Sequence, residues 1–591
     1  MPDILMHKTA VRGVPQVSVS QTSTLVTRTG SWKSIRPEYH DRMAPCNQGC
    51  PVGIDIEGYM NLLREGRVEE ARDLLLAENP MPSVTGRVCH HPCENACNRR
   101  FLDGAVAIHA VERVLGDLAD ASPAAATGAL PRVERVAVVG SGPAGLACAY
   151  HLARFGYRVT VFEAALQAGG MLRLGIPEYR LPRPVLDRAI ARIVAQGQGV
   201  EIRCGARVGS DPTWSELTST FNAVCVATGA HVSRALDVPG EALRGVQRGL
   251  DFLRDVNAGA RPSLGRHVVV VGGGNTAMDC ARAALRLGAA VTVAYRRTRD
   301  EMPAIAEEVE EALREGATLS FLANPVEIVG PAGSVSGVVC ERMALGEPDA
   351  SGRRRPVPTG ERFTIAADTV LTAIGESAEL DGLPADVTTS ASGMRVEALG
   401  GTNRVALFAG GDVTDLERTV ADALGAGKRA AIGIDRHLRA VANNENEATS
   451  ADALRFGGGN VSAAQWTGRD PIRRVAPVNE VVGLDDLNLH HFARVPRQDD
   501  AHLSTGAAIA AFDEVNTGLT KDQAIAEANR CFNCGVCTQC DVCLIYCPDA
   551  AISHVADGEA NYDVALDYCK GCGICVAECP RGALTMTRDR A

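Results

Sequence analysis

The sequence predicts an α/β protein with two Rossmann-like nucleotide-binding domains, preceded by a helical domain and followed by a small α+β domain. Three observations support this fold class. Two segments, about 130 residues apart, each read strand, glycine-rich turn, helix and strand. Ten of the 20 cysteines lie in the last 61 residues. Five further cysteines lie between residues 46 and 97, in a stretch with a mostly helical pattern.

The length of 591 residues is too great for one hydrophobic core and indicates about four domains. Composition shifts and the Pro/Ala/Gly-rich segment 121–131 suggest where the boundaries fall. We expect an N-terminal arm (1–30), a helical domain (31–120), a first nucleotide-binding domain (131–260 and 360–440), a second one (261–359), a linker region (441–520) and a C-terminal domain (521–591).

Composition excludes several classes of function. A net charge of −11 argues against nucleic acid as a partner. We find no apolar run of 18 residues, so we expect no membrane span, and the first 30 residues lack the apolar core of a signal peptide. Many clustered thiols without a secretion signal favour a cytoplasmic protein that uses cysteines for metal binding rather than for disulfides.

The C-terminal cysteines carry the most specific pattern of the chain. The run C-x2-C-x2-C-x3-C-P occurs twice, at 537–548 and 569–580. This spacing is typical of bacterial ferredoxin domains, where the fourth cysteine of each run binds the other cluster. Buried structural cysteines have no reason to repeat it. We therefore expect two [4Fe-4S] clusters, one on Cys537, Cys540, Cys543 and Cys579, the other on Cys569, Cys572, Cys575 and Cys547.

The first glycine fingerprint, G-x-G-x-x-G at 140–145, follows an apolar strand and precedes a helix. Gly140 would make the tight turn, Gly142 would let the backbone approach a pyrophosphate, and Gly145 would let the helix pack on the strand. Glu163, at the end of the next strand, could bind ribose hydroxyls. The short segment 408–412 ends in a Gly-Asp pair that could place a carboxylate near a cofactor's polyol chain. The candidate residues for this nucleotide are Gly140, Gly142, Pro143, Ala144, Gly145, Glu163, Gly170, Met171, Leu172, Arg183, Gly229, Gly411, Asp412 and Thr419.

The second fingerprint spans 272–277, with Ala277 in place of the third glycine. Its candidate binding residues are Gly272, Gly274, Asn275, Thr276 and Ala277. The following strand ends in Arg296 and Arg297 rather than in an acid, and arginines there can bind a ribose 2′-phosphate. NADP is therefore favoured over NAD. The alternative is that the two arginines lie on the surface or pair with Glu301.

The N-terminal cysteines are Cys46, Cys50, Cys89, Cys93 and Cys97, and their spacing differs from that of a zinc finger. Iron–sulfur ligation is the better interpretation, with zinc or inert thiols as alternatives. Five other cysteines (Cys148, Cys204, Cys225, Cys280 and Cys340) look like core residues of the nucleotide-binding domains. Besides the eight ferredoxin-type ligands, seven cysteines remain: the five N-terminal ones, Cys531 and Cys534. One non-cysteine ligand would complete two more clusters.

Together these motifs resemble the small (β) subunit of NADPH-dependent glutamate synthase and its relatives, including the matching half of dihydropyrimidine dehydrogenase. The resemblance covers about residues 31–440 and rests on CNQGCPVGIDI (46–56), GRVCHHPCENAC (86–97), GSGPAGL (140–146), GGMLRLGIPEYRLPR (169–183), GGGNTAMD (272–279), YRRTRDEMPA (295–304) and FAGGD (408–412). It implies FAD in the first domain, NAD(P)H in the second, and two N-terminal [4Fe-4S] clusters. The C-terminal domain resembles the small ferredoxin-type subunit of 2-oxoacid:ferredoxin oxidoreductases. The overall order resembles the iron–sulfur flavoprotein that serves dissimilatory sulfite reductase.

The chain departs from the glutamate synthase pattern at one place. The family usually has an extra C-x2-C before the position of Cys46, where this chain has Glu38 and Asp41. Cys531 and Cys534 look like the missing pair. The resemblance thus suggests one cluster on Cys46, Cys97, Cys531 and Cys534, and another on Cys50, Cys89, Cys93 and Glu112, which lies where the family places a Gln or Glu ligand. The alternative is a single N-terminal cluster with Cys531 and Cys534 unligated.

These features predict an FAD-dependent NAD(P)H:acceptor oxidoreductase that passes electrons through [4Fe-4S] clusters to a redox protein such as a ferredoxin, a sulfite reductase or a 2-oxoacid oxidoreductase. The hydride step belongs to the cofactors, so we name no catalytic residue. One alternative is a true glutamate synthase β subunit, which the added ferredoxin domain argues against. Another is a nucleotide-binding redox sensor or assembly module without turnover. The acceptor, the direction of flow and a homodimeric state stay open.

Overall fold

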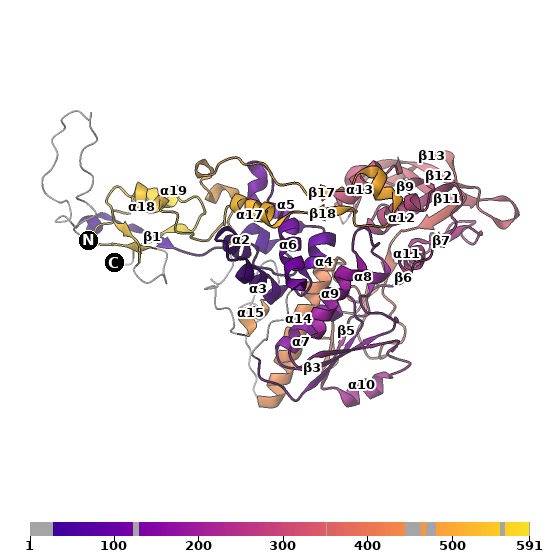
Figure 1. Ribbon diagram of the computed structural model, residues 1–591, viewed down its shortest axis with the longest axis horizontal. Helices are drawn as coiled ribbons and strands as arrows, with labels where there is room; N and C mark the ends of the chain where they lie inside the picture. Colours follow the sequence, from indigo (N-terminus) through magenta and orange to yellow (C-terminus); the bar gives the residue numbers. More distant parts are fainter. Residues whose placement is uncertain are drawn as a thin grey trace. The chain divides into compact units, whose positions relative to one another are not determined.

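The computed structural model describes residues 28–121, 129–349, 352–443, 462–467, 480–555 and 562–589, and these form two compact units (Figure 1). Unit 1 combines 28–42, 485–492 and the ferredoxin-type segment from 535. Unit 2 combines the rest, from 43 to 484 and from 493 to 534. Residues 1–27 of the predicted arm (1–30), and residues 444–461 and 468–479 of the predicted linker region (441–520), lie outside the described residues. No helix in the described part is long and apolar enough to cross a membrane.

The first nucleotide-binding domain of unit 2 contains a parallel sheet with strand order β16-β5-β2-β3-β4. β2 (Arg135–Val139), the glycine turn, α7 (Pro143–Arg154) and β3 (Arg158–Glu163) follow the predicted order. β4 (Val200–Cys204), β5 (Ala223–Val226) and β16 (Leu407–Ala409) complete the sheet. The long helix α14 (Val420–Asn443) runs beside α7, as Figure 1 shows in orange against purple. Helices α9 (Arg183–Val194) and α10 (Trp214–Thr220) cover the remaining faces.

The second nucleotide-binding domain has the parallel order β10-β9-β8-β14-β7. β8 (His267–Val271), α12 (Asn275–Arg286) and β9 (Ala290–Tyr295) form its strand–turn–helix–strand unit, followed by α13 (Ala306–Arg314) and β10 (Thr318–Phe321). Strands β7 (Val246–Arg248) and β14 (Thr369–Thr372), with α11 (Gly249–Asn257), belong to this domain too. The domain is therefore wider than the predicted 261–359, because both flanking strands pair with the β8 side of the sheet.

A three-stranded antiparallel sheet extends from the second domain. It consists of β11 (Ala323–Val329), β12 (Gly337–Pro348) and β13 (Arg354–Ala366). A short two-stranded ribbon, β6 (Val232–Ser233) with β15 (Glu376–Ser377), joins the two nucleotide-binding domains.

The N-terminal part of unit 2 is helical, as expected. Its helices are α1 (Pro45–Gln48), α2 (Ile56–Arg64), α3 (Val68–Glu78), α4 (Pro82–Val88), α5 (Pro92–Ala96) and α6 (Ile108–Asp120). α2 and α3 are separate helices, because Gly66 turns the chain between them with φ of 76°.

The sequence assigned no function to residues 493–520 of the predicted linker region (441–520), and it placed 521–534 in the predicted C-terminal domain (521–591), whereas the structure places both stretches in unit 2. The segment 493–534 packs on the helices and on the second nucleotide-binding domain. It contains α16 (Thr505–Ala510), the pair β17 (Ala501–His502) and β18 (Asn516–Gly518), and α17 (Lys521–Arg530). In Figure 1, α17 lies beside α2 and α6 although more than 400 residues separate them in the sequence. Ala508 and Val515 are buried in the core of the second domain.

Unit 1 is the small α+β domain expected at the C-terminus. α18 (Val542–Tyr546) and α19 (Ile574–Ala577) each lie within a cysteine run, before its fourth cysteine, and β19 (Ile552–Ser553) pairs with β20 (Asp563–Val564). β21 (Leu584–Arg588) pairs with β1 (Ile35–Tyr39) from the start of the chain. Residues 31–42 thus belong to this unit rather than to the predicted helical domain 31–120, because β1 covers the edge of β21.

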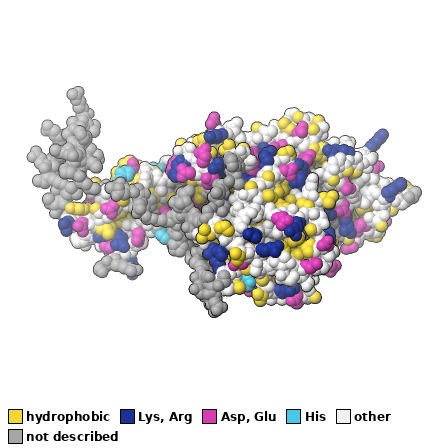
Figure 2. Space-filling view, turned by 60° about the horizontal axis from the view of Figure 1, so that its bottom comes forward, with side chains coloured by type: hydrophobic (Ala, Val, Ile, Leu, Met, Phe, Trp, Pro, Cys, Tyr) yellow, Lys and Arg dark blue, Asp and Glu magenta, His cyan; other side chains and the backbone are white. Residues whose placement is uncertain are grey.

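Charges of both signs are interspersed on the face drawn in Figure 2, with no large patch of one sign. Inside unit 2, in contrast, a buried ionic network joins the 175–183 loop of the first domain to α12 and α13 of the second. Arg180 donates to Asp279 at 2.9 Å and lies 2.7 Å from Glu308. The carboxylate of Glu315 accepts from Arg282 and Arg286, both at 2.6 Å, and its side chain is 1% exposed. The Arg180 contacts fix the second domain against the first, and the Glu315 contacts fix α13 against α12 within the second domain.

We expect Glu315→Gln to destabilise the second domain by about 3–5 kcal/mol, because two buried guanidinium groups lose their shared charge partner. The midpoint of chemical denaturation, followed by circular dichroism, measures the effect. Glu201→Gln is the matched control, since Glu201 pairs with Arg203 on the exposed edge of β4 and such pairs contribute at most about 1 kcal/mol. Equal shifts for both variants would contradict a structural role for the network.

Candidate cofactor-binding site and metal centres

A cavity of about 1590 Å³ opens between the two nucleotide-binding domains of unit 2, and both glycine fingerprints line it. Single small-molecule pockets usually measure about 300–1,000 Å³, so this cavity has room for two nucleotides. The predicted residues that line it are Gly140, Gly142, Pro143, Ala144, Glu163, Gly170, Met171, Leu172, Gly229, Gly272, Gly274, Asn275, Thr276, Arg296, Arg297, Asp412 and Thr419.

The glycines of the first fingerprint differ in their surroundings. A Cβ on Gly145 would lie 1.9 Å from the carbonyl oxygen of Gly140, so helix α7 packs here only with glycine. A Cβ on Gly142 would meet nothing nearer than 4.0 Å. The open side of Gly142 faces the cavity and leaves the approach to the N-terminus of α7 free for a pyrophosphate.

Two carboxylates of the first domain line the cavity, and they differ in their hydrogen bonds. Glu163 is buried and accepts hydrogen bonds from the backbone N–H groups of Ser141 (2.9 Å) and Ala165 (2.7 Å). Asp412 has a buried Oδ1 atom without a partner in the described part of the chain. Burial raises the pKa of Asp412 to about 6, against the opposing charge of Arg418. A hydroxyl donor from a bound polyol would satisfy this oxygen, so the residues fit a flavin dinucleotide.

The second fingerprint presents its open glycine to the same cavity. A Cβ on Gly274 would meet no atom within 4 Å, whereas a Cβ on Gly272 would lie 2.1 Å from the carbonyl oxygen of Ala373. The two arginines after β9 differ. Arg296 is exposed, and its guanidinium has no hydrogen bond or ion pair within the described ranges. Arg297 is buried and donates to Asp349 and to the Arg354 carbonyl, both at 2.8 Å.

Four predicted residues do not line the cavity. Three of them are Gly145, Ala277 and Gly411. The fourth, Arg183, donates to the carbonyl oxygens of Leu172 (3.0 Å) and Ile176 (2.9 Å) and does not face a ligand. Glu301 caps the turn at Thr298. Several lining residues were not predicted, because they lie outside the glycine fingerprints and come from other elements: Val88, His90, Arg353, Glu376 and Arg418.

The N-terminal cysteines and the pair after α17 form two groups of thiols in unit 2. Burial raises the pKa of Cys46, and the nearby thiols of Cys97, Cys531 and Cys534 raise it further. Burial also raises the pKa of Cys93, together with Cys50, Glu94, Cys89 and Glu112. The two ligand sets stay a prediction.

Two polar side chains beside these thiols fit iron–sulfur groups. Burial raises the pKa of Glu112 to about 7, although its Oε1 accepts from Thr85 and from Asn79. The hydroxyl of Tyr59 is buried without a partner among the described residues, and the charges of Cys46, Cys50, Cys93 and Glu112 all act on it. A sulfur acceptor placed among these thiols would satisfy the hydroxyl.

In unit 1 the thiols of the two cysteine runs affect one another's pKa. Burial raises the pKa of Cys537 to about 12, together with Cys543, Cys540 and Cys579. Burial raises the pKa of Cys575 likewise to about 12, together with Cys569, Cys547, Cys572 and Cys543. The completion of each run of three thiols by the fourth cysteine of the other run stays a prediction.

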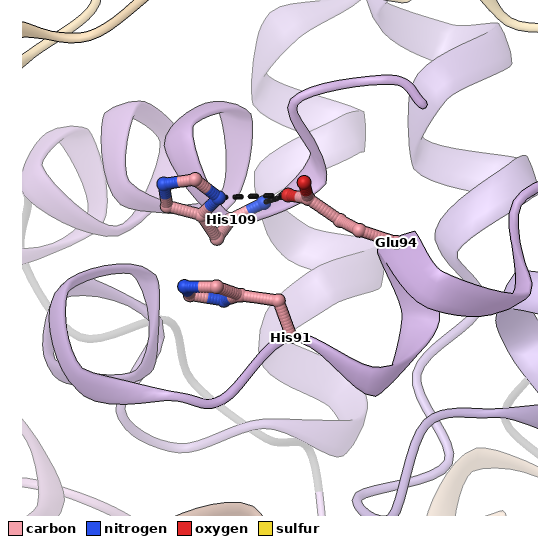
Figure 3. Close-up of side chains that lie close together, drawn as sticks. All are labelled: His91, Glu94 and His109. Carbon is pink, nitrogen blue, oxygen red and sulfur yellow. Dashed lines mark hydrogen bonds and ion pairs between the residues drawn. The ribbon is translucent and has the colours of Figure 1, made fainter. Parts of the chain in front are cut away.

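A third polar group in unit 2 was not predicted. His91, Glu94 and His109 lie together, and Figure 3 shows the Glu94 carboxylate pointing to the His109 ring above His91. Nδ1 of His109 is 2.7 Å from Glu94, and Nε2 is 3.1 Å from Asp500. Burial alone would lower the pKa of His109, but the two carboxylates raise it to about 10. An imidazolium that donates from both nitrogens has no lone pair for a metal, so this is a charge network.

The five remaining cysteines form neither thiol group. Cys148, Cys225, Cys280 and Cys340 are buried core residues as expected. Cys204 is exposed, because it ends the edge strand β4, and this differs from the expected core position.

Comparison with protein families accounts for most of the chain. Residues 134–431 match the pyridine nucleotide-disulphide oxidoreductase family. Residues 40–123 match the family described as dihydropyrimidine dehydrogenase domain II, 4Fe-4S cluster, and residues 536–583 match the 4Fe-4S dicluster domain.

Three relatives show the range of the family. The chain is 39% identical over 523 residues to the NADP(+)-dependent formate dehydrogenase subunit beta of Moorella thermoacetica, covering 83% of this chain and 70% of that protein. It is 39% identical over 531 residues to the NADPH-Fe(3+) oxidoreductase subunit beta of Geobacter sulfurreducens (83% and 75%). It is 36% identical over 428 residues to the small chain of NADPH glutamate synthase of Escherichia coli (66% and 87%).

Among solved structures, FprA of Mycobacterium tuberculosis in complex with NADPH matches with 20% identity and a TM-score of 0.47, over 57% of this chain and 91% of FprA. The family matches and the relatives together settle the class of protein. The chain belongs to the pyridine nucleotide-disulphide oxidoreductase family, and it is an FAD- and NAD(P)-dependent oxidoreductase with 4Fe-4S domains on both sides of its nucleotide-binding domains.

Proposed function

We propose that the chain is an NADPH:acceptor oxidoreductase subunit, which passes electrons between NADPH and a redox protein through FAD and four [4Fe-4S] clusters. The observation that carries the proposal is the shared cavity, because one cavity receives both glycine fingerprints. A flavin bound there can exchange a hydride with a nicotinamide and exchange single electrons with metal centres. The protein supplies the phosphate-binding sites and the carboxylate of Asp412. Part of the cavity wall is formed by the two sequence neighbours of Cys89.

One part of the cavity wall offers a route for electrons from the flavin to an iron–sulfur cluster. Val88 and His90 both line the cavity, and Cys89 lies between them in the sequence at the end of α4. We assign Cys50, Cys89, Cys93 and Glu112 to the cluster next to the flavin site. In unit 1 we assign Cys537, Cys540, Cys543 and Cys579 to one cluster and Cys569, Cys572, Cys575 and Cys547 to the other.

The first experiment is anaerobic dye reduction with NADH and NADPH in parallel, on protein that carries FAD and clusters. We expect reduction with both nucleotides and a clear preference for NADPH. No reduction with either nucleotide, on protein shown to contain FAD, would favour a nucleotide-binding sensor or assembly module.

The proposed preference for NADPH rests on Arg296, which lines the cavity after β9 and whose guanidinium has no hydrogen bond or ion pair in the described part of the chain. We expect Arg296→Ala to raise the KM for NADPH by about tenfold or more, because a charge-assisted contact to the 2′-phosphate is lost. The KM for NADH should stay nearly constant. Arg299→Ala is the control, since Arg299 is exposed, pairs with Glu310 and does not line the cavity. Equal effects on the two nucleotides would exclude 2′-phosphate recognition by Arg296.

Arg297 has a different role, because its guanidinium already donates hydrogen bonds within the protein. It holds Asp349 and the Arg354 carbonyl, and Asp349 N–H donates to the Arg353 carbonyl at 2.7 Å. These bonds fix the turn between β12 and β13, where Arg353 lines the cavity. We propose that Arg297 positions Arg353 as a second ligand for the 2′-phosphate.

Arg297→Lys should therefore weaken the binding of NADPH without changing kcat. A lysine cannot donate to both Asp349 and the Arg354 carbonyl in the fork geometry of a guanidinium. Titration calorimetry with 2′,5′-ADP and with 5′-AMP separates the phosphate contact from the adenosine contacts. We expect about tenfold weaker binding of 2′,5′-ADP only, and a similar loss in Asp349→Asn. A parallel loss for 5′-AMP would point to general disruption of the domain.

The acceptor is proposed to be a redox protein, because the relatives named above are subunits of larger enzymes. A ferredoxin, a sulfite reductase or a 2-oxoacid oxidoreductase fits the ferredoxin-type unit. Glutamate synthase is the second candidate, on the strength of the small-chain match. Copurification with a large amidotransferase subunit would support it. We place the protein in the cytoplasm, where thiols stay reduced.

A further inference from the structure

Both ends of the chain contribute to the thiol group around Cys46. Cys46 lies in α1 and Cys97 ends α5, whereas Cys531 ends α17 and Cys534 follows one turn later. The family profile for the N-terminal 4Fe-4S domain covers only 40–123, so it contains two of these four cysteines. We propose that Cys46, Cys97, Cys531 and Cys534 together hold one [4Fe-4S] cluster, completed by the C-terminal segment. The inference rests on the proposed electron-transfer function.

Direct contacts hold the second pair of cysteines against the first. The Asn98 amide, next to Cys97, donates to Cys534 Sγ at 3.7 Å and to the Val482 carbonyl at 3.1 Å. Asn533, between the two C-terminal cysteines, donates to Glu57 on α2 at 3.0 Å. Arg64 donates to the amide oxygen of Asn533, also at 3.0 Å. Both asparagines are buried, so the contacts fix the loop in one position.

The helix before this loop is fixed even more firmly. The Arg530 side chain is 1% exposed and pairs with Glu527 at 2.8 Å. Arg530 also donates to the carbonyl oxygens of Gly104 (2.9 Å) and Val495 (3.0 Å). Glu527 in turn accepts from the Ala107 N–H at 2.8 Å. Burying a charged pair costs desolvation free energy, which many hydrogen-bond partners must offset. Here these partners join α17 to the turn between Cys97 and α6.

The local backbone also suits a metal-bound sulfur. The N–H of Asn533 points to Cys531 Sγ at 3.4 Å, in the same way that the His91 N–H points to Cys89 Sγ at 3.4 Å. N–H groups directed at cysteine sulfur stabilise the anionic cluster and tune its potential. The thiols that lie near Cys46 are those of Cys97, Cys531 and Cys534.

The test is the iron content of cysteine variants in the FAD-loaded full chain. The wild type should contain about sixteen irons, four for each of four clusters, and Cys531→Ser or Cys534→Ser should contain about twelve. Cys204→Ser is the matched control, because Cys204 is exposed and outside every thiol group. Reduced samples of either variant should lack one electron paramagnetic resonance signal, the same one that Cys46→Ser lacks.

Double variants decide whether the two pairs share a cluster. Cys46→Ser combined with Cys531→Ser should lose no more iron than each single variant, whereas Cys50→Ser combined with Cys531→Ser should lose about eight irons. Additive loss in the first pair overturns the proposal. NADPH-dependent reduction of FAD should persist in the Cys531 variant, and its absence from the wild type would overturn the proposed function instead.

A measurement on the wild type covers the case in which a variant does not fold. During stepwise removal of iron by a chelator, mass spectrometry after iodoacetamide treatment should show Cys97 and Cys531 becoming alkylated together. Alkylation of Cys531 while the iron content stays at about sixteen would contradict the assignment.

Discussion

The buried guanidinium of Arg530 is the contact on which the architecture of unit 2 depends. It joins the end of α17 to the backbone at residues 103–105 and 495, and it is neutralised by Glu527 one turn earlier. A charge at 1% exposure is stable only with a full set of partners, so this segment has one position on the helical layer. The loop with Cys531 and Cys534 directly follows α17, so its position is fixed as well.

A second set of buried charges has the same function between the nucleotide-binding domains. Arg180 comes from the first domain, and Asp279 and Glu308 come from the second. The Arg418 guanidinium of the first domain donates to the Glu376 carbonyl at 2.9 Å, and the Glu376 side chain bonds to Thr276 at the start of α12. The cavity is therefore bounded by elements that are fixed to each other, and the two nucleotide sites are held in one geometry.

The sequence predicted the features that depend on local pattern. The glycine turns, the strand–helix–strand units and the ferredoxin spacing follow from steric and ligand constraints within about 30 residues, and the structure contains them all. The residues that it missed come together only in the fold. Arg297 pairs with Asp349 across a hairpin, β7 and β14 join a sheet from outside the predicted domain, and β1 crosses to the ferredoxin-type unit. No local periodicity signals such pairings.

The wide separation of Cys97 and Cys531 has a consequence for biosynthesis. The ribosome adds about 5–20 residues per second, so the 434 residues between these cysteines (531 − 97) take roughly 20–90 seconds to synthesise. The nascent N-terminal helices therefore wait in the cell with two of the four thiols of a proposed cluster and without the helix that covers them. With the proposed ligand set, this cluster gains all of its ligands only after α17 has been translated. Cys46 and Cys97 would then stay reduced and unmetallated until the last tenth of the chain arrives.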